Sequence, residues 1–432
     1  MTPIQIGILG CLFLFVLLFT SMPVAFAMIT AGVAGFALIV TPHAAFSMVT
    51  ADLFETFSSY SLTVIPLFVF MGQVAFHAGI SKRLFKTAYT WIGHLPGGLA
   101  MATVGACTGF GAICGSGPAT AATMASVALP EMKRYNYSDE LAAGTVAAGG
   151  SLGMLIPPSV VFIVYALITE QSIGALFLAG ILPGILIAFL FCLSIYFRCI
   201  INPELGPAGP RTRWVTRLMS LQGILETLIL FVAVMGGMVF GLFTPIEAAA
   251  IGAAGSLIIA FVKKQLSWPK LKRIIFETVR TSSMVFFTVA GAVIFGRFLA
   301  VSRIPFSIAE WFTTLPLPGW GVMALIILFF LIAGCFIDAL ALVLLTIPIF
   351  YPVILELGFD PIWFGVMVVV ITQMGVVTPP VGVNVYVVSG IERDIPLQSI
   401  FKGALPYLLM LLAAAAILIL VPQISLILPN SV

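Results

Sequence analysis

The sequence predicts an all-α polytopic membrane protein with ten membrane crossings and two re-entrant helical hairpins, arranged as two inverted halves. Three observations predict this fold: the hydrophobic content, the placement of the charges and a set of repeated motifs. Of the 432 residues, 61% are hydrophobic and only 8% are charged, and the mean hydropathy is +1.20. A chain with so little polar surface cannot form a water-soluble globule, and its apolar runs are long enough to span a bilayer.

Apolar runs of roughly 17 to 25 residues mark the crossings. The first run lacks a basic leader and a small-residue cleavage site, so we interpret it as a retained helix and not as a signal peptide. The predicted crossings are residues 4–20, 24–41, 62–78, 141–168, 173–197, 222–241, 246–262, 277–301, 361–388 and 399–421. Two longer apolar stretches remain, residues 96–130 and 319–350, and each has glycine and a kinking or polar residue near its middle.

Basic residues predict that the first of these stretches enters the membrane and returns. Lys82, Arg83 and Lys86 precede it, and Lys133 and Arg134 follow it. Because Lys and Arg concentrate on the cytoplasmic side of membrane proteins, both of its ends are predicted to be cytoplasmic. The stretch is therefore expected to be a re-entrant hairpin.

The same rule assigns all but two of the 19 Lys and Arg residues to the cytoplasmic side. The exceptions, Arg297 and Arg303, fall toward the opposite face. Residues 319–350 lie between Arg303 and the acidic pair Glu356 and Asp360, so the ends of the second hairpin face outward. The two hairpins are thus predicted to point in opposite directions, and both chain termini to lie on the outer side.

Repeated motifs divide the chain into two halves, residues 1–205 and 220–432, joined by a cytoplasmic linker, residues 206–219. "LFTSMPVA", "GMLIPP" and "AGILPGIL" in the first half recur in register as "LFTPIEAA", "GVVTPP" and "KGALPYLL" in the second. Each half has five crossings, and an odd number turns the second half upside down relative to the first, which is the inverted-repeat layout of secondary transporters. Amphipathic connectors, residues 43–58 and 263–276, are expected to lie along the membrane interface as arms.

Each half contains a crossing that a Pro–Pro pair breaks, within residues 141–168 and 361–388. Unsatisfied backbone groups are costly in hydrocarbon, so a break is tolerated where the freed groups line a polar cavity. Freed carbonyls can coordinate a cation, and the helix N-terminus beyond the break offers amides to an anion. The hairpin tips, residues 114–120 and 333–338, are the expected partners of the two breaks, because their small and hydroxyl residues allow close approach and provide oxygen ligands.

Two sodium sites and one anion site are therefore predicted. The first cation site comprises Ser116, Gly117, Thr120, Gly153, Ile156 and Pro158. The second comprises Gly334, Asp338, Gly375, Thr378 and Pro380. The uncharged donors expected to bind a carboxylate or sulfonate are Ser116, Thr120 and Asn384.

Sodium is favoured over protons because Asp338 is the one titratable group expected near the midplane, whereas carbonyl and hydroxyl cages do not titrate. Alternatives stay open at this stage: a proton-coupled transporter of the same class, or an ion channel. Ser116 and Thr120 have an ordinary explanation as helix caps, and Asp338 as a hydrogen bond at its tip. Helix-end or interfacial roles are equally open for three further residues, Glu226, Glu247 and Arg297.

No enzyme is predicted. An intramembrane serine protease needs a histidine deep in a neighbouring span and an aspartyl protease needs a second facing Asp, and the sequence supplies neither. It has no "GxxxxGK[ST]" nucleotide motif. The six cysteines show no C-x-x-C spacing, which argues against a metal centre other than sodium, and no organic cofactor is expected.

Four segments carry a resemblance to a known family: "GSGPATAATMASVALPEM", "GGSLGMLIPPSVVFIVYALITEQSIGALFLAGILPG", "IDALALVLLTIPIFYPV" and "QMGVVTPPVGVNVYV". They resemble the large membrane subunit of tripartite ATP-independent periplasmic (TRAP) transporters, the DctM/SiaM-like permeases. The resemblance covers essentially the whole chain. It implies a sodium-driven importer of organic acids in the bacterial inner membrane that works by an elevator motion. In that membrane the outer side, on which the charge bias places both termini, is the periplasm.

The resemblance also implies partners. These are a small TRAP membrane subunit, a periplasmic substrate-binding protein, the organic acid anion and membrane lipid, with no nucleic acid. Because no four-helix segment precedes Met1, the small subunit is expected to be a separate chain.

Overall fold

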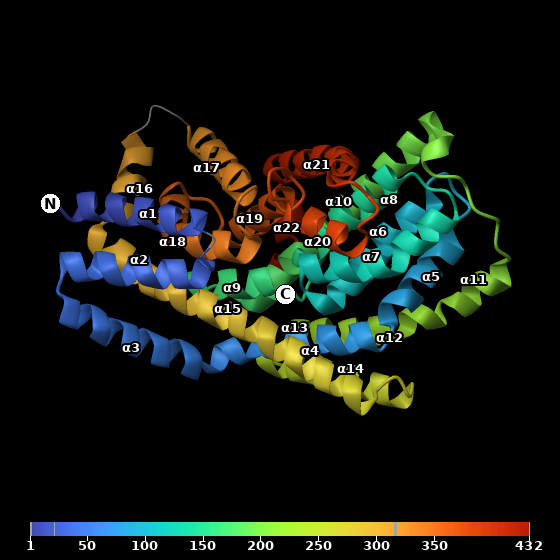
Figure 1. Cartoon of the computed structure of the whole chain (residues 1–432), viewed down its shortest axis with the longest axis horizontal. Coiled ribbons are helices and arrows are strands. Elements are labelled where there is room, and N and C mark those ends of the chain that lie inside the picture. The colour runs from blue at the N-terminus through green and yellow to red at the C-terminus, as the bar shows by residue number, and fades with distance from the viewer. Residues whose placement is uncertain (1, 21, 315–317, 432) are drawn as a thin grey trace.

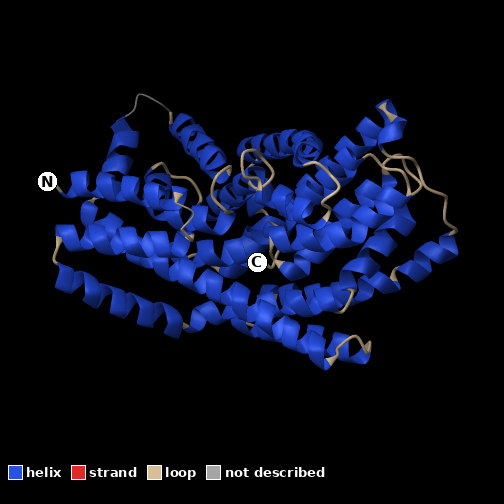
Figure 2. Cartoon of the chain, in the orientation of Figure 1, coloured by secondary structure: helices blue, strands red, loops and turns tan. Residues whose placement is uncertain are grey.

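The computed structural model describes residues 2–20, 22–314 and 318–431. Throughout these residues the secondary structure is helical, and Figure 2 shows helices joined by loops without a strand. Seven of the described helices are long and apolar enough to cross a membrane, and further apolar helices are shorter. The chain is thus a multi-span membrane protein, as predicted, while the count of ten crossings stays a prediction.

The described part of residues 1–205, the predicted first half, contains ten α-helices. They are α1 Pro3–Phe19, α2 Val24–Ile39, α3 Pro42–Ser58, α4 Val64–His77, α5 Ile80–Ile92, α6 Gly98–Cys114, α7 Gly117–Arg134, α8 Asp139–Ser151, α9 Val160–Thr169 and α10 Ile173–Ile201. Short 3-10 turns lie at Tyr60–Thr63 (η1), Leu152–Met154 (η2) and Pro203–Leu205 (η3).

The rest of the chain begins with α11, which lies mostly within the predicted linker, and continues into the predicted second half, residues 220–432. Its elements are α11 Trp214–Ser220, α12 Gln222–Phe231, a π segment Val232–Gly236 (η4), α13 Gly237–Val239, α14 Pro245–Val262, α15 Trp268–Ser302, α16 Ile304–Thr314, α17 Gly319–Gly334, α18 Ala339–Glu356, α19 Pro361–Gly375, α20 Val383–Ile391, α21 Leu397–Leu420, α22 Gln423–Leu426 and η5 Pro429–Ser431. Figure 1 shows α15 beside α2 in the lower part of the molecule, and the two helices are in contact.

Two features of the arms differ from expectation. The predicted connector at residues 263–276 is not separate, because α15 begins at Trp268 and continues unbroken for 35 residues into the following crossing. Amphipathic helices α5 and α16 were not predicted. In α5 the buried Ile80, Leu84 and Phe85 form one face while Lys82 and Lys86 are exposed. A scan for spanning runs overlooks such a helix because polar residues interrupt its apolar face along the sequence.

The broken crossings α8–α9 and α19–α20 lie at the centre of the packing. Every residue of α8 from Leu141 to Ser151 is buried. Glycine lets α21 approach α8 closely, since the backbones of Gly144 and Gly403 lie against each other.

Contacts between the halves come in matching pairs. α7 contacts α20, and their counterparts in the opposite halves, α18 and α9, also contact each other. In the same way, the contact of α8 with α21 is matched by that of α19 with α10, and the contact of α2 with α15 by that of α14 with α4. Each pair joins elements that occupy matching places in the order of the two halves.

Candidate functional site

The first hairpin, α6 and α7, holds its tip against the first break, residues 152–159, which separates α8 from α9. The amide of Val160 donates to the carbonyl of Gly115 over 3.3 Å. Gly153 lies so close to the tip that an added Cβ would come within 2.5 Å of Thr120 Oγ1 and 2.9 Å of the Ser116 carbonyl oxygen. Three predicted members of the first cation site, Ser116, Thr120 and Gly153, are therefore brought together.

The hydroxyl groups of this tip do not cap α7. Ser116 stands at the N-cap position, but its side chain makes no capping hydrogen bond and it lines the cavity described below. Thr120 is fully buried, and its hydroxyl donates back to the Ser116 carbonyl over 2.8 Å. Because a hydroxyl oxygen that donates one hydrogen bond keeps its lone pairs, Thr120 Oγ1 can still act as an oxygen ligand.

The second hairpin, α17 and α18, meets the second break, residues 376–382, in a similar way. The amide of Val381 donates to the Cys335 carbonyl over 3.2 Å, and the backbones of Gly334 and Gly375 are in contact. The Thr378 hydroxyl donates to the Met374 carbonyl over 2.6 Å. In both breaks the Pro–Pro bond is cis.

Asp338 at the second tip caps α18. Its Oδ1 accepts from the amides of Leu340 over 3.0 Å and Ala341 over 3.3 Å. The structural role that sequence analysis left open is thus present. Asp338 also lines the cavity between the hairpins, so its carboxylate is available to a ligand there.

Each break contains a run of backbone carbonyls that accept no hydrogen bond from the described residues. Among the hydrogen bonds of the described residues, none is accepted by the carbonyl oxygens of residues 155–158 or of the matching residues 377–380. Four consecutive carbonyls without a donor are unusual in helical structure, where each normally accepts an amide. Pro158 and Pro380, two predicted cation ligands, belong to these runs, as do Ile156 and Thr378.

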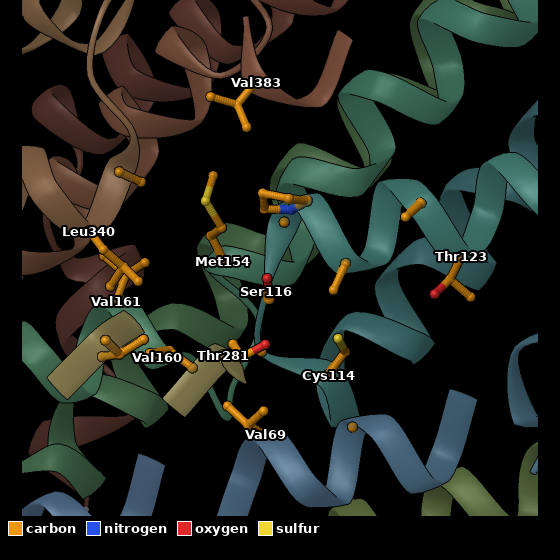
Figure 3. Close-up of a pocket in the computed structure, with 18 of the residues that line it drawn as sticks. Val69, Cys114, Ser116, Thr123, Met154, Val160, Val161, Thr281, Leu340 and Val383 are labelled. Carbon is orange, nitrogen blue, oxygen red and sulfur yellow. The ribbon is translucent and has the colours of Figure 1, made fainter. Parts of the chain in front are cut away.

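One cavity of about 610 Å³ is lined by both hairpin tips. Ser116, Gly117 and Met154 reach it from the first half, and Asp338 and Val383 from the second. Figure 3 shows Ser116 and Met154 near the centre of the view, with Leu340 to their left and Val383 above them. The N-termini of α7 and α18 border the cavity, which places partial positive charge beside it.

A further wall comes from α4 and α15 and was not predicted. Gln73, Glu277 and Thr281 line it. Glu277 is held in place, because its Oε1 accepts from Arg273 Nε over 2.8 Å and its Oε2 lies 3.4 Å from His77 Nε2. Sequence order gave no signal for this wall, since hydropathy does not say which distant crossing faces a hairpin tip.

The remaining predicted site residues lie apart from the cavity. Ile156 packs its side chain against Gly184 of α10, and Pro380 is exposed. Asn384 is fully buried, and its Nδ2 donates to the Ala147 carbonyl of α8 over 3.0 Å. Of the three predicted anion-binding residues, only Ser116 belongs to the described cavity lining.

Ion pairs and a helix cap account for the three charged residues whose role the sequence left open. Glu226 accepts a hydrogen bond from Arg83 over 2.5 Å and forms an ion pair with Lys263 over 2.8 Å. Glu247 completes a capping box with Thr244 at the start of α14. Arg297 lies 3.5 Å from the buried Asp52, so all three have structural contacts.

Comparison with known proteins places the chain in a family. Residues 11–424 match the model of the tripartite ATP-independent periplasmic transporter, DctM component. The chain is 40% identical over 379 residues to the C4-dicarboxylate TRAP transporter large permease protein DctM of Pseudomonas aeruginosa, with 88% of each chain covered. It is 34% identical over 415 residues to the sialic acid TRAP transporter large permease protein SiaM of Vibrio cholerae, with 96% of each covered.

The fold is also similar to a solved structure. The YdaH transporter of Alcanivorax borkumensis superposes with a TM-score of 0.61 at 16% identity, covering 87% of this chain and 88% of that one. The family consists of transporter permeases, so the prediction that the chain is not an enzyme is confirmed. The resemblance in the four quoted segments is likewise confirmed, and the chain belongs to the DctM-component family of the tripartite ATP-independent periplasmic transporters.

Proposed function

We propose that this TRAP permease imports an organic acid anion by sodium-coupled alternating access. The observation that carries the proposal is the matched pair of tip-and-break contacts, each leaving four backbone carbonyls without a donor. Oxygen-rich, uncharged groups of this kind suit an alkali cation. Both tips reach one cavity, so a cation at each break would lie at the edge of a common anion site.

The sodium ligands follow from the placement of the oxygens. In the first half they are Thr120 Oγ1, the Ser116 carbonyl and the freed carbonyls of the break; the close approach of Gly153 keeps these groups together. In the second half they are the Thr378 hydroxyl, the Asp338 carboxylate and the carbonyls of residues 377–380. Cations at both breaks would offset the charge of a bound anion, which makes binding of the two cooperative.

The substrate class follows from the cavity and from the relatives. The named substrates of the two relatives above, C4-dicarboxylates and sialic acid, both carry carboxylates. In this chain the N-terminus of α7 and the Ser116 hydroxyl offer donors to such a group, whereas the amides of Leu340 and Ala341 in α18 already donate to Asp338. A periplasmic binding protein delivers the acid, and a separate small membrane subunit completes the transporter.

Ion pairs support the topology that the charge bias predicts. Lys133 contacts Glu392 and Asp394 over 3.5 and 3.4 Å, which joins two loops assigned to the cytoplasmic side. Hydrogen bonding to Asp394 raises the Lys133 pKa above its usual value. Arg297 and Asp52 pair at the side assigned to the outside. We therefore propose inverted halves, periplasmic termini and an elevator motion of the hairpins and broken crossings along α4 and α15.

Reconstituted liposomes with the partner subunits test sodium coupling. Asp338→Asn should raise the sodium concentration for half-maximal uptake by about tenfold, as expected for loss of one charged ligand, and Thr378→Ala should raise it less. Asp360→Asn is the matched control, because Asp360 caps α19 through two backbone amides as Asp338 caps α18. Uptake that persists on a proton gradient without sodium would instead assign the chain to proton coupling, and single-channel current would assign it to a pore.

A further inference from the structure

Gln373, on α19, is a fully buried amide without a partner. Its side chain is 0% exposed, and neither Oε1 nor Nε2 has a hydrogen-bond partner among the described residues. Beyond the second break, Asn384 is also 0% exposed, and its Oδ1 has no hydrogen-bond partner among the described residues. Buried polar atoms are nearly always paired with protein or ordered water, so three unpaired atoms around one break call for a ligand.

Backbone contacts bring the two amides toward the same end of α8. The amide of Asn384 donates to the Val376 carbonyl over 3.0 Å, so α20 folds back onto the residue one helical turn beyond Gln373. Asn384 Nδ2 binds the Ala147 carbonyl of α8. α19 contacts η2, which directly continues α8. The C-terminal end of α8 thus contacts the segments that carry both amides.

The first break has no such unpaired group. In the alignment of "GMLIPP" with "GVVTPP", the positions matching Gln373 and Asn384 are Ser151 and Phe162. The Ser151 hydroxyl donates to the Ala148 carbonyl over 2.7 Å, and Phe162 has no polar atom in its side chain. Among these matched positions, the unpaired side-chain atoms therefore belong to the second break.

We propose that Gln373 and Asn384 together hold one buried molecule with the hydrogen-bonding capacity of water. The unpaired atoms are two amide oxygens, which accept, and one amide nitrogen, which donates. Water donates twice and accepts, and a buried water typically makes about three hydrogen bonds of this kind. A sodium ion would be coordinated by the two oxygens and would leave the Gln373 Nε2 donor unpaired.

This molecule would tie α19 to α20 across the second break, and Asn384 Nδ2 joins the break to α8 of the opposite half. Gln373 and Asn384 are then positioning residues, because they hold the segment that carries the carbonyls of residues 377–380 without contacting the substrate cavity. The inference stands on buried amide groups alone and does not depend on the cation that drives transport.

A double-mutant cycle on the purified full chain in nanodiscs tests the proposal by thermal unfolding. Gln373→Met removes both polar atoms at similar side-chain length, and Asn384→Leu removes the second amide. If both hold one molecule, Gln373→Met lowers the Tm by about 2–4 °C, and the double variant is less destabilised than the sum of the single variants. An unchanged or raised Tm in Gln373→Met, or strict additivity, would overturn the proposal.

Two further measurements separate the occupants. Ser151→Ala is the matched control in the first break, and it should show no coupling to Gln373→Met because its hydroxyl is bonded within its own helix. The cycle is then repeated with sodium replaced by choline. Coupling that is unchanged supports water, whereas coupling that disappears without sodium would assign the amides to a cation and overturn the proposal.

Discussion

The two Pro–Pro breaks have similar sequences and similar backbone contacts but different surroundings. Every residue of the first break, 152–159, is buried, whereas residues 379–381 of the second are exposed and Thr378 is partly exposed. The difference begins on the neighbouring helix. Gly184 of α10 accommodates the Ile156 side chain, but the matching residue of α21 is Tyr407, whose hydroxyl lies 2.5 Å from Thr145 Oγ1 on α8.

A shared motif fixes local bonding but not accessibility. The bonds from Val160 to Gly115 and from Val381 to Cys335 match, because they depend on the backbone of the motif and its tip. Burial depends on residues elsewhere, such as a glycine or a tyrosine one helix away. The first break is buried along its whole length, whereas the second is open on one side and has unpaired amides on the other.

The largest effect is expected from adding a methyl group at Gly375, where the second break lies closest to its hairpin tip. In Gly375→Ala the new Cβ would overlap the backbone of Gly334, which cannot rotate away as a side chain can. We expect destabilisation of about 1–3 kcal/mol and loss of most uptake. Gly390→Ala on α20 is the control, since nothing lies within 4 Å of its added Cβ. Equal behaviour of the two variants in unfolding and uptake assays would contradict the close packing of tip and break.

The two breaks are expected to differ in how fast cysteines placed in them react with thiol reagents. In a background without native cysteines, Thr378→Cys should react with a small maleimide at least about tenfold faster than Ile156→Cys, since exposure controls thiol reactivity. Ile156 is only 7% exposed. Labelling is followed by mass spectrometry on the reconstituted protein. Similar rates at both positions would show that the breaks are equally enclosed.

The smallest effect is expected at the ion pair that joins a loop of the first half to a loop of the second. The raised pKa of Lys133 comes first from its hydrogen bond with Asp394. A raised pKa stabilises below the unfolded value of about 10.4, and the contribution is lost as pH rises through the folded value. Because the Lys133 side chain is 55% exposed, Lys133→Met should lower the Tm by about 1 °C or less at neutral pH. A larger drop in calorimetry, or one insensitive to salt, would mean that this contact holds the halves together.

Sequence reasoning reached the parts of this fold that depend on local chemistry. The hairpin tips and both breaks could be located because glycine and proline interrupt apolar runs that would otherwise be continuous helix. The continuity of α15 could not be predicted, since the polar residues before Glu277 look like a connector that ends before the crossing.

The site was less accessible to sequence reasoning than the fold. The cavity wall at Gln73 and Thr281 comes from helices far from the tips in the sequence, and only tertiary packing brings them there. Gln373 was overlooked because one amide in a long apolar run hardly changes its hydropathy. Asn384 was recognised as polar, but its orientation toward Ala147 depends on how α20 packs on α8.

The unbroken course of α15 makes the two sides of the molecule mechanically unequal. At 1.5 Å per residue, its 35 residues form a rod about 52 Å long. The corresponding stretch of the first half is divided into α3 and α4 by the four-residue turn Tyr60–Thr63. A displacement of one end of α15 moves the other end as well, because the helix is continuous. A displacement of α3 can instead change the angle between α3 and α4 at the turn. One side therefore has a continuous helix and the other a turn, and residues 59–63 are expected to bend more easily than α15.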